Sequence, residues 1–206
     1  SNQALSRIAE EMAKQGYTTS LVRHNITNDE IRDIVNETLA SLPLVGKKEP
    51  KPEPPSLWGT SEPEEETDEA AFTILCELLL NSQHAKPGMM LFAYRTFTHD
   101  GEEFVELVTR NFHGNIPNIS EAVAFDYSGT GESRRGQGLP AILTRVLGPF
   151  QGEVRIESEG RGLRFFNPTQ EPIQSMHLFQ RLIDASESFD SPVTAGTQMT
   201  VRIPMK

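Results

Sequence analysis

The chain has 206 residues, of which 36% are hydrophobic, and it carries a formal net charge of −10 with a single cysteine. A chain of this length fits one domain with a small appendage. The acidic charge repels phosphate backbones and disfavours broad, non-specific binding of nucleic acid. The lone Cys76 excludes an intrachain disulfide framework and a zinc site built on cysteines. No apolar run is long enough to span a membrane and no signal peptide is evident, so we expect a cytoplasmic protein.

Residues 1–45 are expected to form a small helical segment. Apolar residues at helical spacing predict a helix over 4–15, and a short helix or turn is expected over Thr18–Asn25. Thr27 and Glu30 have the spacing of a capping box, and the periodic apolar residues that follow predict a helix over Asn28–Leu42. Such a segment suits docking to a partner protein or homodimerisation.

DNA binding and phosphotransfer are two other functions to consider for this segment. The same order of helices is found in a helix-turn-helix, with Asn28–Leu42 as the recognition helix that would bind DNA. Because acidic residues outnumber basic ones here, docking or dimerisation is favoured over DNA binding. His24 precedes the capping box and is therefore expected outside the long helix, whereas a phosphoacceptor histidine lies within one.

A linker is predicted over residues 46–67. Prolines interrupt helix and sheet hydrogen bonding, and a run of glutamates adds self-repulsion. Such a composition does not bury enough apolar surface to fold alone. The sequence therefore indicates a solvated spacer between the N-terminal segment and a domain over 68–206.

The segment Asp68–Ala85 predicts a largely buried helix, because apolar residues cover most of its surface. Glu77 and Asn81 nevertheless lie one turn apart on one face of this helix. A carboxylate and an amide on a helix with so little polar surface need a partner. The simpler alternative is that both side chains lie on the solvent-exposed side.

An antiparallel hairpin is expected after this helix. Met89–Thr98 and Glu103–Arg110 have the composition of strands, and the Asp100-Gly101 pair between them is typical of a tight turn. A loop rich in glycine and arginine, 128–138, then leads into an apolar helix over Leu139–Leu147. That arrangement offers backbone N–H donors to a phosphate, although a plain surface loop has the same composition.

Three more strands complete the predicted sheet. They are expected at Gln151–Ser158, Gly160–Phe166 and Gly196–Pro204. Between the last two, residues 168–194 are interpreted as an insertion with a helix over Ile173–Ala185.

Four of these features occur in the order found in the GHKL ATPase superfamily, which includes histidine-kinase catalytic domains and anti-sigma-factor kinases, and the chain over Glu69–Lys206 resembles that superfamily. The helix motif Glu77-Leu-Leu-Leu-Asn81-Ser-Gln-His84-Ala85 is similar to its N-box. The motif Arg135-Gly136-Gln-Gly138-Leu139-Pro140 is similar to its second glycine box. Residues 150–158 resemble the strand that follows, and Gly196-Thr197 resembles the final Gly-Thr motif.

The resemblance implies an α+β fold of the Bergerat type: a two-layer sandwich of a mixed, mostly antiparallel sheet with helices on one face. It also implies a regulatory protein that binds ATP and Mg²⁺, with kinase or slow ATPase activity. By resemblance, Asn81 would hold Mg²⁺ against the nucleotide phosphates and Glu77 would orient and deprotonate the attacking water. The other nucleotide contacts implied are His84, Asn111, Arg134, Arg135, Gly136, Gly138, Leu139 and Thr197.

The first glycine box departs from the family pattern. Asn111 stands where the family has an Asp that accepts a hydrogen bond from the adenine amino group, and His113 and Asn115 replace two glycines. A rival alignment places this box at residues 126–131, close before the second glycine box. Two further functions therefore stay open: a non-catalytic module for protein–protein contact, and a nucleotide-responsive DNA-binding regulator.

Overall fold

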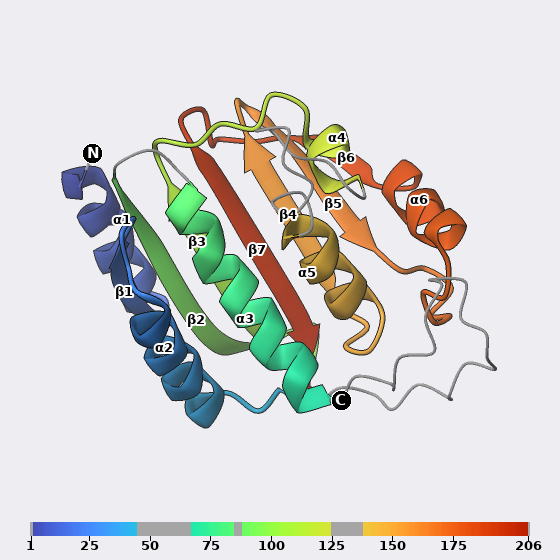
Figure 1. Ribbon diagram of the computed structural model, residues 1–206, viewed down its shortest axis with the longest axis horizontal. Coiled ribbons are helices and arrows are strands. Elements are labelled where there is room, and N and C mark those ends of the chain that lie inside the picture. The colour runs from blue at the N-terminus through green and yellow to red at the C-terminus, as the bar shows by residue number, and fades with distance from the viewer. Residues whose placement is uncertain (1, 45–66, 85–87, 125–137, 206) are drawn as a thin grey trace.

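One open sheet of seven strands, in the order β1-β2-β3-β7-β4-β5-β6, organises the chain (Figure 1). The computed structural model describes residues 2–44, 67–84, 88–124 and 138–205. Every pair of neighbouring strands in these residues is antiparallel. The sequence predicted a mixed, mostly antiparallel sheet; the described part has no parallel pair, and β7, which lies between β3 and β4, runs opposite to both. The strands are β1 (Thr18–Arg23), β2 (Met89–His99), β3 (Glu102–Asn111), β4 (Glu153–Ser158), β5 (Arg161–Phe166), β6 (Glu187–Asp190) and β7 (Thr197–Pro204).

Two tight turns fix the strand register. Asp100 and Gly101 join β2 to β3 with φ values of 49° and 78°, and Glu159 and Gly160 join β4 to β5 with 53° and 79°. Positive φ at both central residues is the type I′ geometry, whose twist matches that of the flanking strands. The predicted Asp-Gly hairpin is thus confirmed.

A layer of helices covers one face of the sheet (Figure 1). It contains α2 (Asn28–Ser41), α3 (Thr67–His84), α4 (Ile119–Val123), α5 (Gly138–Leu147) and α6 (Met176–Asp184). The main core lies between this layer and the sheet, as the predicted burial of α3 requires. Its most buried side chains, each at most 1% exposed, include Leu75, Leu78, Phe92, Leu107 and Val201.

The remaining helix, α1 (Asn2–Lys14), packs on the opposite face, over β1 and β2. Side chains alternate along a strand, so Arg95 of β2 points away from the main core that contains Phe92 and Tyr94. The Arg95 guanidinium donates a hydrogen bond of 2.9 Å to the carbonyl oxygen of Gln15, just after α1. The helices of residues 67–205 thus lie on one face, as predicted, and α1 of the N-terminal segment, whose position the sequence did not predict, packs its buried Leu5 against the other.

The N-terminal region contains a strand that the sequence analysis missed. Thr18–Arg23, expected as a short helix or turn, forms the edge strand β1 and pairs with β2 along its whole length. The β-branched threonines and Val22 suit a strand, but the partner strand lies some 70 residues further on, so only tertiary pairing decides the outcome. Because a strand separates α1 from α2, these residues do not form a helix-turn-helix.

The second helix of that region agrees with its prediction. The Thr27 hydroxyl accepts a hydrogen bond of 3.2 Å from the backbone N–H of Glu30, and the capping box is complete. α2 packs beside α3 in the helix layer, so residues 2–44 share one sheet and one core with the rest of the described chain. The predicted linker, residues 46–67, lies outside the described residues except for Thr67.

The predicted insertion, residues 168–194, extends the sheet. It forms α6, whose bounds agree with the predicted helix to within three residues, and the unpredicted β6, which pairs with β5. Ser175 caps α6 by accepting a 3.1 Å hydrogen bond from the N–H of Leu178. The short helix α4 was also not predicted, since five residues carry too little periodic signal.

Candidate functional site

Glu77 and Asn81 of α3 converge on the first residue of α5. A Cβ added to Gly138 would lie 3.2 Å from Oε2 of Glu77 and 3.3 Å from Oδ1 of Asn81. The two oxygens therefore aim at one point, where α5 begins and its first backbone N–H groups have no acceptor within the helix. The structure thus brings together three residues that the sequence predicted for the site.

The Glu77 carboxyl group is half-buried between α3 and α5. Burial raises its pKa above the ordinary value for glutamate, and the positive charge of Arg145 on α5 opposes that shift. A carboxylate with a raised pKa is a stronger base than a fully solvated one. Glu77 therefore binds a proton more readily than a solvated glutamate does.

A second set of predicted residues meets where β3, β7 and β4 lie side by side. The register pairs Asn111 with Thr197 and Thr197 with Ser158. The Thr197 hydroxyl donates to the carbonyl oxygen of Gly114, and the Ser158 hydroxyl donates to the carbonyl oxygen of Gly196 at 2.9 Å. The first bond fastens the loop after β3 to the beginning of β7, and the second fastens the end of β4 to the residue before β7.

The loop after β3 is also held by its own asparagines. The Asn111 side-chain oxygen accepts a 2.9 Å hydrogen bond from the N–H of Gly114, and that of Asn115 accepts one of 2.7 Å from the N–H of Gly196. Gly196 has a φ of 75°, and a Cβ there would collide with the Asn111 carbonyl oxygen. Loop and strand thus approach so closely that only glycine fits at residue 196.

Both groups of residues lie at the same end of the sheet. Asn111 pairs with Met90, at the beginning of β2, and a Cβ on Gly88 would collide with the His113 ring. Gly88, just before β2, therefore lies against the loop after β3. Figure 1 shows α3 and β3 ending, and β7 beginning, toward this same end.

The other predicted residues are placed as follows. Leu139 is half-buried and packs against the main core. His84 is the last residue of α3, but its side chain lies outside the described residues. Arg134, Arg135 and Gly136, and residues 126–131 of the rival alignment, lie outside them as well.

Ser158 and Arg145 belong to this region but were not predicted, and Asn115 was noted only as a departure from the first glycine box. Ser158 is 1% exposed, and its hydroxyl also accepts a 2.9 Å hydrogen bond from the N–H of Ile116. A serine at a strand end carries no sequence signal of its own, because only the pairing of β4 with β7 places it here. Arg145 could have been noticed as the one charged side chain of α5, seven residues after Gly138.

The donor set fits a hard cation. Carboxylate and amide oxygens are the ligands that Mg²⁺ prefers, and it keeps several waters and phosphate oxygens as further ligands. Among the described residues no three histidine, cysteine, aspartate or glutamate side chains are grouped so as to hold a metal ion. A cation at Glu77 and Asn81 would thus need phosphate oxygens as its further ligands.

Neither of the two pockets described, of about 580 and 350 Å³, includes Glu77, Asn81 or Asn111. The larger pocket lies between α4 and the β5–β6 pair, beside the loop after β3, and the smaller lies on the face of the sheet that carries α1. Pocket size therefore does not point to the predicted site. The convergence of Glu77 and Asn81 on Gly138 is better evidence, because it places chemically suitable groups together.

No protein-family model matches the sequence, and no curated protein matches it. Within the described residues, no helix is long and apolar enough to cross a membrane.

Proposed function

We propose that this protein is a regulatory protein that binds ATP with Mg²⁺ through a domain of the GHKL type, and that it acts as a kinase or a slow ATPase. The observation that carries the proposal is the convergence of the Glu77 and Asn81 oxygens on Gly138. Residues from the predicted N-box and the predicted second glycine box thus lie in contact, although 57 positions separate Asn81 from Gly138.

The element order supports the same proposal. A buried helix with Glu-x-x-x-Asn is followed by a hairpin, a loop, a helix that begins with glycine, and a final Gly-Thr strand. Thr197 lies beside Asn111 in the sheet. Two residues that contact the same base have to be neighbours in this way. Adenine would lie near this pair and the phosphates near Gly138, where unpaired N–H groups favour anions.

The residues of the chain have distinct roles in this proposal. Asn81 offers its side-chain oxygen to the cation, and Glu77, with its raised pKa, accepts a proton from the attacking water or hydroxyl group. When bound, Mg²⁺ would neutralise part of the negative charge of the phosphates. Arg145 lies close enough to Glu77 to offset part of the cost of burying its charge.

Titration calorimetry with ATP, with and without Mg²⁺, tests the binding. We expect Mg²⁺-dependent binding that Asn81→Ala weakens at least about tenfold, which corresponds to about 1.4 kcal/mol. Asn36→Ala, an asparagine on the exposed side of α2, is the matched control and should bind like the wild type. If the folded wild type binds neither ATP nor ADP, the proposal fails.

A non-catalytic module is the second candidate. It is favoured by the loop after β3, where the side-chain oxygens of Asn111 and Asn115 are already used by backbone N–H groups. An acceptor that is occupied in this way serves an adenine amino group less well than a free carboxylate would. Glu77→Gln separates the two functions: in a catalyst it abolishes turnover and preserves ATP binding, whereas in a binding module there is no turnover to lose.

A further inference from the structure

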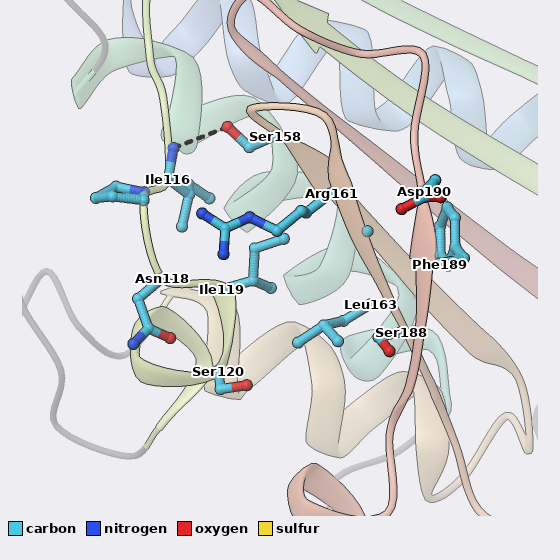
Figure 2. A pocket seen from close by; sticks show the side chains of 12 residues that line it. Ile116, Asn118, Ile119, Ser120, Ser158, Arg161, Leu163, Ser188, Phe189 and Asp190 are labelled. Atoms are coloured by element: carbon cyan, nitrogen blue, oxygen red, sulfur yellow. Dashed lines mark hydrogen bonds between the residues drawn. The ribbon is translucent and has the colours of Figure 1, made fainter.

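The larger pocket, of about 580 Å³, has no role in the function proposed above. The loop 116–118 and α4 form one wall, and β5 with β6 forms the other (Figure 2). Its volume falls within the range of small-molecule sites, about 300–1,000 Å³. We therefore asked which ligand its side chains would bind.

Arg161 provides the only cationic group among the residues that line this pocket. It directly follows the tight turn at Glu159 and Gly160, and its side chain extends from β5 toward Ile116 and Asn118 (Figure 2). Among the described residues its guanidinium group makes no hydrogen bond and no ion pair, not even with Asp190, the residue opposite it on β6. The N–H donors of its guanidinium group are therefore available to a ligand.

Apolar side chains lie beside that guanidinium group. Ile119 is 7% exposed, Ile116 and Leu163 are half-buried, and all three line the pocket near Arg161 (Figure 2). Ser120 and Ser188 add hydroxyl groups to the rim. A cation above an apolar surface suits a molecule that has both an anionic end and an apolar body.

Asn118 adds a second donor. Its side-chain oxygen caps α4 by accepting a 3.1 Å hydrogen bond from the N–H of Glu121. A backbone N–H can only donate, so this bond fixes the orientation of the amide and leaves the NH₂ group as the available end. Asp190, the one carboxylate in the lining, lies across the pocket from Asn118 and disfavours a second negative charge on the ligand (Figure 2).

We infer that this pocket binds a small amphipathic anion, with one carboxylate or phosphate group on Arg161 and an apolar ring or short chain on Ile116, Ile119 and Leu163. A guanidinium group binds either anion through paired hydrogen bonds. The inference is independent of ATP binding, since it uses none of the residues assigned to the nucleotide.

Amide NMR titration of the full chain with benzoate and with phenyl phosphate tests it. We expect saturable shifts at residues 116, 118–120, 161–163 and 188–190, with a dissociation constant in the millimolar range for at least one probe. Arg161→Gln should weaken that binding at least tenfold. Arg181→Gln, on the exposed side of α6 and outside the pocket, is the matched control and should bind like the wild type.

The pattern of binding identifies the anion and can overturn the inference. Binding of one probe alone assigns the site to that class of anion. Ser188→Phe, which places a ring in the pocket from an exposed position, should abolish binding without unfolding the protein. The inference is wrong if neither probe gives saturable shifts, if folded Arg161→Gln binds as the wild type does, or if inorganic phosphate and acetate bind as tightly as the aromatic probes.

Discussion

Gly138 lies against the carboxylate of Glu77 so closely that a Cβ at residue 138 would be 3.2 Å from Oε2. A side chain at the first residue of α5 would therefore push the Glu77 carboxylate away by a few tenths of an ångström. The same position would be 3.3 Å from the Asn81 oxygen. Gly138 thus lies next to both predicted ligand groups, the Glu77 carboxylate and the Asn81 amide.

The first prediction concerns Gly138→Ala. Contacts of 3.2–3.3 Å are tighter than most Cβ contacts, so the Glu77 and Asn81 side chains must move by a few tenths of an ångström. We expect Mg-ATP binding to weaken about tenfold by calorimetry. The melting temperature should change little, because alanine favours a helix and Gly138 has no positive φ. Unchanged affinity would show that this contact is not part of the nucleotide site.

The second prediction compares two glycines with nearly equal backbone conformation. Gly196 and Gly101 have φ values of 75° and 78°, but a Cβ on Gly196 would collide with the Asn111 carbonyl, whereas one on Gly101 would meet nothing within 4 Å. Gly101→Ala should cost about 1–2 kcal/mol, the penalty for a side chain in this region. Gly196→Ala should cost clearly more in urea denaturation, by about 2 kcal/mol for displaced backbone. Equal losses would contradict the close approach.

The third prediction concerns Glu106, which is 1% exposed. It accepts hydrogen bonds from the Tyr17 hydroxyl, from Arg95 at 3.3 Å and from Arg202 at 2.6 Å. Glu106→Gln removes the counter-charge of the partly buried Arg95 and leaves Arg202 with the more distant Glu153 at 3.6 Å, so we expect the free energy of unfolding to fall by about 2–4 kcal/mol.

Urea denaturation measures this loss, and Glu103→Gln is its control. Glu103 is exposed on the same strand, so its replacement should change stability by less than about 0.5 kcal/mol. Similar effects of the two substitutions would mean that Glu106 does not link Tyr17, after α1, to the sheet.

The fourth prediction follows from the raised pKa of Glu77. A carboxyl group with a raised folded-state pKa binds its proton more tightly when folded, so its contribution to stability is full below about pH 4 and is lost as pH rises through the folded pKa. Glu77→Gln removes this loss. The melting temperature of the variant should therefore be higher than that of the wild type at pH 8 and equal to it at pH 3.5.

Thermal unfolding of both proteins across that range measures the effect. Glu69→Gln, at an exposed position of the same helix, should follow the wild type at every pH. A Glu77→Gln variant that loses stability at pH 8 would show that the carboxylate is stabilised by its surroundings, not penalised by burial.

The sequence by itself determined the features that depend on near neighbours. The capping box at Thr27, the type I′ turn at Asp100 and Gly101 and the burial of α3 all follow from spacings of a few residues, and each is present in the structure. The pairing of Glu77 with Asn81 on one helix face is likewise a consequence of helical geometry.

Only the tertiary structure decided which distant segments meet. Val22 and its neighbours form a strand because they pair with β2. α1 packs on the second face of the sheet, where it covers β1 and β2. Ser158 entered the candidate site because β7 lies between β3 and β4. The space at Gly138, which joins the two halves of the predicted site, comes from the packing of α5 on α3, and packing between segments this far apart leaves no periodic signal in the chain.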